Sequence, residues 1–192
     1  RGIIKVSALG AAVDSPAEIL RQHGESDNML INCGVPYAIL RPNSFYQNLL
    51  WQAGQIRRRG KFSLPLADAP QSLVDIRDIA EATLKLCQND TLDNKIYRLT
   101  GPQSLTCYQL AEQLSKVLNK PVKYLATTAK ASAQAMLAAG MPQWHVSVLS
   151  KLQQLFANGD FAAINDDLAT LLGRKPTTFA DFSRDFASHF AR

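Results

Sequence analysis

The sequence predicts an α/β fold, in which a parallel sheet is followed by a smaller, mostly helical region. The main observation is the order strand, helix, strand over residues 2–40, because such a unit places its two strands parallel. A second observation is the change after residue 128, where the sequence becomes rich in alanine and in helical patterns. The chain has 192 residues, 46% hydrophobic and 19% charged, and is therefore long enough to bury a sizeable core.

The first strand is expected at residues 2–9. This segment is rich in β-branched residues and poor in charge, so both faces of the strand are expected to be buried. A helix follows over residues 17–33, after the start signal Asp14-Ser15-Pro16. Gly24 weakens this helix, because glycine has a low helix propensity.

The second strand, residues 35–40, stops at Arg41-Pro42, and a helix is expected directly afterwards. Carboxyl ends of parallel strands meet at one edge of a sheet, so the polar turns at Ser7-Ala8 and Pro42-Asn43 are expected to lie side by side. In open α/β sheets, ligands bind in the crevice at that edge. The alternative is that Pro42 merely ends the strand and that Asn43 or Ser44 caps the helix.

Helical and strand patterns continue to the end of the chain. Asp75, with Asp78 three residues on, has the spacing of a capping box, and so do Thr106 with Gln109 and Thr178 with Asp181. Apolar stripes appear on four predicted helices: Phe45, Leu49, Ala53 and Ile56; Ile76, Ile79, Ala80, Thr83, Leu84 and Cys87; Leu110, Ala111, Leu114, Val117 and Leu118; and Phe179, Phe182, Phe186 and Phe190. The remaining expected elements are the helix over residues 44–59 that carries the first stripe, strands at 62–66, 95–100 and 122–126, and helices at 129–139 and 142–158.

Much of the net charge of +5 lies in Arg57-Arg58-Arg59-Gly60-Lys61. These cations fall in the last turn of a predicted helix, where they favour the helix dipole, and Gly60 suits the position after it. A nucleic-acid surface is the alternative, but the cluster lacks interleaved aromatic residues. We therefore expect no nucleic-acid partner.

No apolar segment approaches the roughly 20 residues of a membrane span. The three cysteines, Cys33, Cys87 and Cys107, show neither a C-x-x-C pair nor metal-ligand spacing. We therefore expect a cytoplasmic protein with reduced cysteines, no metal site and no membrane association.

Several segments stand in a characteristic order over nearly the whole chain: Val6-Ser7-Ala8-Leu9-Gly10, His23-Gly24-Glu25, Leu40-Arg41-Pro42-Asn43, Val74-Asp75-Ile76-Arg77-Asp78, Leu99-Thr100-Gly101-Pro102 and Thr178-Phe179-Ala180-Asp181-Phe182. In this order the sequence resembles the NmrA-like branch of the atypical short-chain dehydrogenases/reductases, with members similar to NAD(P)H:quinone oxidoreductases and sugar-nucleotide epimerases. The resemblance implies the carboxyl-terminal half of a Rossmann-type parallel sheet over residues 1–101, with an insert at about 44–75. It implies a small helical substrate domain over residues 102–192.

No G-x-G-x-x-G phosphate turn follows a strand in this chain. The resemblance therefore implies the carboxyl-terminal two-thirds of such a protein. A truncated or cleaved chain, an amino-terminal part that is not described, and a genuine short gene product are the open explanations, and the absence of a starting methionine favours the first two.

The resemblance further implies that NAD(P)H, with NADP favoured over NAD, lies against the turns after these two strands. The implied cofactor contacts are Ser7, Ala8, Leu9, Pro42, Asn43, Ser44 and Phe45. For Ser7 the alternative is a turn residue that bonds its own backbone. Without the phosphate turn, this chain alone is expected to bind dinucleotide weakly or not at all.

Typical short-chain reductases carry a tyrosine four residues before a lysine as proton donor, and this chain has His23 and Asp27 at the corresponding place. A functional interpretation makes His23 a proton-donating or positioning group that Asp27 orients. The alternative is an i,i+4 pair on a partly exposed helix surface.

The missing tyrosine–lysine pair favours quinone reduction, in which hydride passes directly to a strongly electrophilic acceptor and protons can come from water. Candidates for an aromatic acceptor pocket are Tyr46, Trp51, Phe62 and Trp144, with ordinary packing as the alternative for each. The leading interpretation is part of an NAD(P)H-dependent oxidoreductase with a small aromatic or quinone-like acceptor. The rival is a non-catalytic NAD(P) sensor of NmrA type that binds a protein partner.

An incomplete sheet would leave the strand at residues 3–6 with an exposed edge, which must be covered or paired. We therefore expect a homodimer, pairing with the missing amino-terminal fragment, or aggregation.

Overall fold

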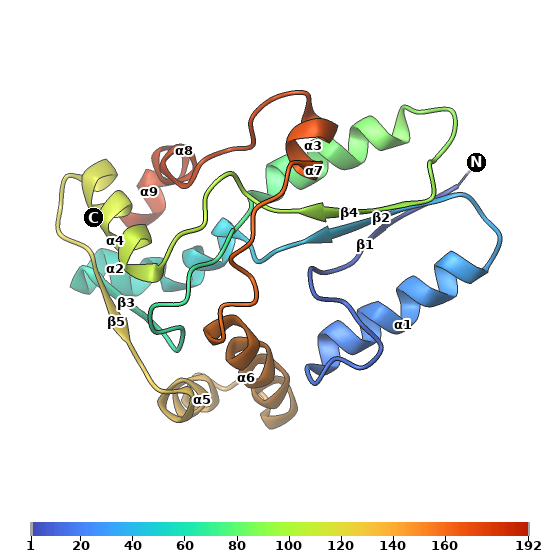
Figure 1. The fold of residues 1–192 in the computed structure, drawn as a ribbon. Helices are drawn as coiled ribbons and strands as arrows, with labels where there is room; N and C mark the ends of the chain where they lie inside the picture. Colours follow the sequence, from blue (N-terminus) through green and yellow to red (C-terminus); the bar gives the residue numbers. More distant parts are fainter. Residues whose placement is uncertain (1, 192) are drawn as a thin grey trace.

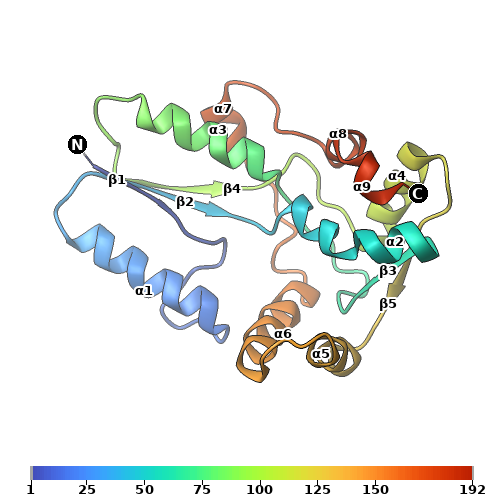
Figure 2. The same ribbon diagram turned by 180° about the vertical axis from the view of Figure 1, so that it is seen from behind.

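The computed structural model describes residues 2–191 and contains a three-stranded parallel sheet (Figure 1). Its strands are β1 (Ile3–Val6), β2 (Tyr37–Pro42) and β4 (Lys95–Leu99), in the order β1-β2-β4. Helix α1 (Glu18–Asn32) lies on one side of the sheet, and α3 (Ile76–Cys87) and α7 (Asp167–Leu172) lie on the other (Figures 1 and 2). The predicted α/β class and the parallel strand–helix–strand unit are confirmed.

A second group of elements surrounds a two-stranded parallel sheet made of β3 (Lys61–Leu64) and β5 (Lys123–Ala126). Around it lie the 3-10 helix η1 (Tyr46–Gln52) and helices α2 (Ala53–Arg59), α4 (Cys107–Leu118), α8 (Phe179–Asp185) and α9 (Ala187–Phe190). Helices α5 (Ala129–Ala138) and α6 (Gln143–Ala157) pack on each other, and α6 also packs on α1. The domain boundary at residue 101 stays a prediction.

The small sheet packs on a core rich in aromatic side chains. Tyr46 meets Phe179 edge-on, with 5.3 Å between ring centroids. Phe179, Phe182 and Phe190 are fully buried, so the apolar face predicted for the last helix is confirmed as core. The helix itself is interrupted at Phe186, which separates α8 from α9.

Two of the three predicted capping boxes form, at Thr106 with Gln109 and at Thr178 with Asp181. Helix α1 begins at Glu18 and has no side-chain cap from the Asp14-Ser15-Pro16 segment. Asp75 caps α3 by accepting a 2.9 Å hydrogen bond from the Arg77 N–H. Asp78 does not complete a box there, because its carboxylate accepts hydrogen bonds from Arg174 and Thr177 in the carboxyl-terminal segment.

The continuous helix predicted over residues 44–59 is wrong. Phe45 has an extended backbone, with φ −103° and ψ 142°, because it pairs with Val74 in a parallel bridge. The chain then forms η1 before the α-helix begins at Ala53. This short extended step keeps Phe45 near the end of β2 instead of on a helix face.

Strand β1 has one hydrogen-bonded neighbour, β2, among residues 2–191, and its outer edge is open. Ile3 and Val6 are 45% and 49% exposed. The prediction that both faces of this strand are buried is therefore wrong. No second strand among residues 2–191 pairs with its outer edge, and the side chains at both of its ends remain exposed.

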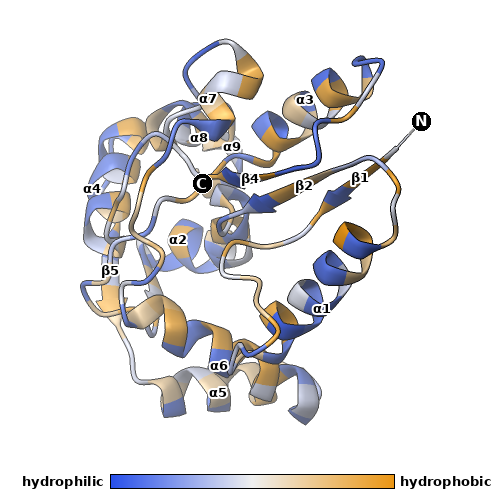
Figure 3. Ribbon diagram, turned by 45° about the vertical axis from the view of Figure 1, so that its right-hand side comes forward, coloured by the Kyte–Doolittle hydropathy of each residue, from blue (hydrophilic) through white to orange (hydrophobic). Residues whose placement is uncertain are grey.

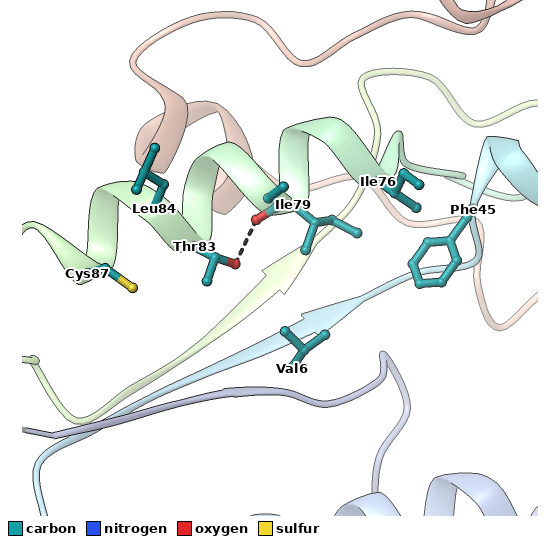
Figure 4. Close-up of a pocket in the computed structure, with 8 residues that line it drawn as sticks. Val6, Phe45, Ile76, Ile79, Thr83, Leu84 and Cys87 are labelled. Atoms are coloured by element: carbon teal, nitrogen blue, oxygen red, sulfur yellow. Dashed lines mark hydrogen bonds between the residues drawn. The ribbon is translucent and has the colours of Figure 1, made fainter. Parts of the chain in front are cut away.

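Most of the apolar stripe of α3 lines an open groove, and of its six members only Ile79 is buried in the core (Figure 4). Leu84 is 58% exposed and Ile76 is 44% exposed. Val6 and Phe45 lie across the groove from α3 in Figure 4, so the groove continues from the open side of β1. Helix α3 instead buries Ile79, Ala82 and Leu86 against the sheet and α7.

Gly24 lies inside α1 because the loop after β1 crosses the helix at that point. A Cβ on Gly24 would lie 2.4 Å from the carbonyl carbon of Ala12, which is far too close for any side chain. The helix-propensity cost of this glycine is thus offset by a close contact that holds the loop next to α1.

Hydrophobic and hydrophilic residues are interspersed along α1 and α3 (Figure 3). Within residues 2–191, no helix combines the length and the apolarity that crossing a membrane requires. The same residues contain no group of three His, Cys, Asp or Glu side chains that could hold a metal ion.

Candidate functional site

A cavity of about 210 Å³ lies at the carboxyl ends of β1 and β2. The two strands are in parallel register, with Val6 opposite Leu40, so the segments after them leave the sheet side by side. The predicted juxtaposition of the two polar turns is confirmed. All seven predicted cofactor contacts line this cavity: Ser7, Ala8, Leu9, Pro42, Asn43, Ser44 and Phe45.

Backbone hydrogen bonds hold the two turns together. The Ser7 N–H donates to the Leu40 carbonyl at 2.7 Å, and the Leu9 N–H donates to the Pro42 carbonyl at 2.8 Å. Because Pro42 lacks an N–H, its participation in the sheet is through this carbonyl. The ladder between β1 and β2 therefore continues beyond the last residue of β1 and fixes the spacing of the cavity floor.

The Asn43 side chain points into the protein, where its polar atoms form hydrogen bonds with other parts of the chain. Its amide nitrogen donates to Ser72 Oγ and to the Phe161 carbonyl, both at 2.9 Å, and its amide oxygen accepts from the Ser44 N–H at 2.7 Å. Asn43 is 3% exposed. The side chain therefore joins the β2 turn to two other loops, and neither Asn43 nor Ser44 caps an α-helix.

Asp27 is the centre of a buried polar cluster beneath the cavity, although it lies on α1. Its carboxylate accepts hydrogen bonds from the Ser7 hydroxyl at 2.9 Å and from Arg41 Nε at 2.9 Å, and it forms an ion pair with Lys5. Asp27 is fully buried. A buried carboxylate requires such partners, and here they come from both strands.

The predicted pairing of Asp27 with His23 is therefore wrong, as is the alternative of an exposed i,i+4 pair. The carboxylate is occupied by Lys5, Ser7 and Arg41, which approach from the sheet side of α1. Helical spacing places His23 and Asp27 on neighbouring positions of one face, but it cannot show that the sheet supplies three donors to one of them.

His23 lines the cavity and is partly exposed. Burial lowers the pKa of its imidazole below the usual 6.5, and the nearby charge of Lys5 lowers it further, while Asp27 acts in the opposite direction. The imidazole is therefore neutral at pH 7 and has one donor and one acceptor nitrogen. It is not a cationic proton donor at that pH.

The four predicted acceptor-pocket aromatics are not brought together. Tyr46 and Phe62 lie in the aromatic core, where they are 1% and 0% exposed. Trp51 is 80% exposed, and Trp144 is 68% exposed and stacks on the neighbouring His145. None of the four lines the cavity. The assignment of Tyr46 and Phe62 to an acceptor pocket is wrong, because both are buried in the core, and that of Trp51 and Trp144 stays a prediction.

The apolar wall of the cavity comes from residues that the sequence pattern did not single out. Phe156 and Phe161 meet edge-on, with 4.7 Å between ring centroids, and close the side opposite the sheet. Ile19 and Leu20 of α1 complete the wall together with Leu152 of α6. The helical spacing of Leu152 and Phe156 on α6 is the one sequence signal from which members of this wall could have been predicted.

Comparisons with known proteins agree with this arrangement. Residues 20–183 match the model of the NmrA-like family. An NAD(P)H azoreductase of Xenophilus azovorans is 34% identical over 184 residues, which are 96% of this chain and 64% of the azoreductase. The chain thus spans less than two thirds of the length of that relative.

Solved structures show the same fold. The NADPH complex of an Escherichia coli NADPH-dependent quinone oxidoreductase superimposes with a TM-score of 0.86 and 26% identity, over 96% of this chain and 65% of the other. The negative transcriptional regulator NmrA, solved with NAD, has a TM-score of 0.67 at 16% identity, over 95% of this chain and 63% of the other, and this likeness concerns the fold alone.

Proposed function

Because the chain belongs to the NmrA-like family, we propose that it forms part of an NAD(P)H-dependent oxidoreductase that reduces a flat, quinone-like or azo acceptor. The observation that carries this proposal is the single cavity into which both strand-end turns and His23 converge. The names of the azoreductase and of the quinone oxidoreductase support the reaction class.

The cavity fits one end of a dinucleotide. Pockets for whole drug-sized ligands occupy roughly 300–1,000 Å³, whereas this one measures about 210 Å³ and suits a single ring with its substituent. Phe45, Leu9 and Phe161 supply apolar surface for a ring, and Ser7 and Ser44 supply polar groups. Among residues 2–191, no lysine or arginine lines the cavity, so the described lining offers no positive charge to a pyrophosphate.

Bound there, a reduced nicotinamide would supply the hydride. The residues of this chain would hold the ring against Pro42 and Phe45 and exclude water with Phe156 and Phe161. Neutral His23 would act as a positioning group, because burial holds the pKa of its imidazole below the usual value. A quinone accepts hydride without a positioned acid, and its protons would come from solvent.

We expect this chain alone to bind NADPH weakly or not at all, since the described residues offer no phosphate cradle. Isothermal titration of the chain with NADPH tests this part, and micromolar binding would contradict it. NADP is favoured over NAD only by the family resemblance, and parallel titrations with NADH compare the two.

The reaction is tested with a chimera in which the amino-terminal third of the Xenophilus azovorans azoreductase precedes this chain. We expect NADPH oxidation with menadione or an azo dye, and a strong reduction of the rate on Phe45→Ala. Trp51→Ala is the matched control, because Trp51 is exposed and does not line the cavity. A folded chimera that binds NADPH but oxidises it with no quinone or dye would overturn the proposal.

A second candidate is a non-catalytic sensor that reports dinucleotide binding to a protein partner. It is favoured by one observation: Asp27 is occupied by Lys5, Ser7 and Arg41, so no acid–base pair faces the cavity. The sensor predicts that the chimera binds NADPH without turnover and that the cofactor changes its affinity for a captured partner. Steady turnover with no captured partner would exclude it.

A further inference from the structure

We infer that Asp27 is a positioning residue that sets the Ser7 hydroxyl as a hydrogen-bond acceptor toward the cavity, so that Ser7 and Ser44 together select a primary carboxamide. This inference rests on the proposed nicotinamide end of the ligand. It goes further by assigning which atoms form hydrogen bonds with the carboxamide. It also names the buried residue that determines whether Ser7 donates or accepts.

The first step concerns the single hydrogen of the Ser7 hydroxyl. Ser7 Oγ lies 2.9 Å from Asp27 Oδ2, and the two residues are 5% and 0% exposed. An ionised carboxylate only accepts hydrogen bonds, so Ser7 must donate its hydrogen to Asp27. What remains on Ser7 Oγ is lone pairs, which accept.

The second step concerns why Asp27 stays an acceptor. Arg41 Nη2 lies 2.8 Å and Arg41 Nε 2.9 Å from Asp27 Oδ2, and Lys5 contacts the other oxygen, Oδ1. Two cations thus face one buried carboxylate. In each of these contacts the nitrogen donates and the carboxylate accepts, as it does in the contact with Ser7.

The third step concerns the opposite polarity of Ser44, which leaves the end of the neighbouring strand. The Asn48 amide nitrogen donates to Ser44 Oγ at 3.1 Å. Ser44 Oγ therefore already accepts, and its own hydrogen is available to a ligand. Ser44 has no other side-chain partner within residues 2–191, and both Ser44 and Asn48 line the cavity.

The two serines thus present one acceptor and one donor on adjacent turns. A primary carboxamide, –C(=O)NH₂, matches this pair, because its N–H groups can donate to Ser7 and its carbonyl can accept from Ser44. A methyl ketone of the same shape keeps the carbonyl but has no N–H. Ser7 would therefore accept a hydrogen bond from the amide nitrogen, and Ser44 would donate one to the carbonyl.

The test uses the whole chain and two ring-sized probes, nicotinamide and 3-acetylpyridine, titrated while the amide spectrum of the protein is followed by NMR. We expect the wild type to bind nicotinamide about tenfold more tightly than 3-acetylpyridine, which is the ratio that one net hydrogen bond would give. Ser7→Ala is expected to bind both probes equally. Ser44→Ala is expected to weaken both by a similar factor and to keep their ratio.

Asp27→Asn tests the polarity itself, because the new amide can donate to Ser7 Oγ and release the serine hydrogen. We expect this variant to lose the preference for nicotinamide and Asp27→Glu to restore it. Glu25→Gln is the matched control, since Glu25 lies on the same helix, pairs with Arg21 at the surface and does not line the cavity, and its preference is expected to be unchanged. The amide spectrum shows whether each variant is folded, and Ser7→Ala decides the matter if Asp27→Asn is not.

Three results would overturn the inference: a wild type that binds both probes equally, a wild type that binds neither at millimolar concentration, or a Ser7→Ala variant that keeps the preference. These readouts need neither phosphate binding nor hydride transfer. A selective site in a chimera without turnover would therefore reject the proposed function alone, and turnover in a chimera whose chain shows no selectivity would reject this inference alone.

Discussion

Arg41 forms a two-point contact with Asp27, since its Nε and Nη2 atoms lie 2.9 Å and 2.8 Å from the same carboxylate oxygen. The contact ties α1 to β2, while Lys5 and Ser7 tie the same carboxylate to β1 and the turn after it. Asp27 thereby connects the helix to both strands that lead into the cavity.

We predict that Asp27→Ala lowers the free energy of unfolding by about 3–5 kcal/mol, because it leaves two partly buried cations, Lys5 and Arg41, without their buried partner. Urea denaturation of the chain measures the change. Glu25→Ala is the matched control on the same helix: Glu25 pairs with Arg21 at the surface, and its loss is expected to cost less than about 1 kcal/mol. Equal effects of the two substitutions would show that the Asp27 cluster does not stabilise the fold.

The pKa of His23 is predicted to lie below 6.5, because burial and then the charge of Lys5 disfavour the protonated imidazole. NMR titration of the imidazole C–H signals measures it. Lys5→Met is expected to raise this pKa and Asp27→Asn to lower it further. The unfolded chain takes up the proton more readily, so the contribution of neutral His23 to stability is present above pH 6.5 and is lost as the pH falls. A midpoint above 6.5 in the wild type would contradict the prediction.

Asn43→Ala is predicted to cost about 1–3 kcal/mol of unfolding free energy, because it removes buried hydrogen bonds to Ser72 and Phe161 and leaves the Ser44 N–H unpaired. Thermal and urea unfolding are the measurements. Asn48→Ala removes an exposed amide that bonds Ser44 Oγ, and its effect is expected within about 0.5 kcal/mol. If Asn43→Ala is as mild as this control, the side chain does not hold the three loops together.

The chain is predicted to self-associate through the open edge of β1 and the adjoining apolar groove. Leu84→Lys is expected to reduce association in sedimentation experiments without lowering the unfolding temperature, because Leu84 is 58% exposed in that groove. Met29→Lys places the same charge on α1, where Met29 is 74% exposed, and is expected to leave association unchanged. A chain that stays monomeric at all concentrations would refute the prediction, as would equal effects of both substitutions.

Local sequence signals predicted the capping boxes and the parallel strands well. Features that depend on contacts between distant segments were predicted less well. The capping boxes at Thr106 and Thr178 depend on residues three apart, and the structure contains both. The parallel strands and the adjacent turns follow from one strand–helix–strand unit. The extended conformation of Phe45, in contrast, depends on pairing with Val74, which no local pattern in residues 44–59 indicates.

The candidate site shows the same division. The residues directly after β1 and β2 could be placed at the cavity because strand direction determines where they emerge. The partners of Asp27 could not, since Lys5 and Arg41 reach it from the sheet. Phe161 lies in a segment without a helical or strand pattern, and only the folded chain brings it to Asn43.

The carbonyl of Phe161 accepts from the Asn43 amide at 2.9 Å and from the Ser72 N–H at 3.0 Å. Through this one atom, the aromatic wall of the cavity and the turn after β2 are fastened to a common loop. Separating the walls would break these bonds in a buried place where no water replaces them. The spacing of the walls is therefore expected to stay constant when a ligand binds. The cavity would then receive its ligand as a preformed site, with no closing motion between the walls.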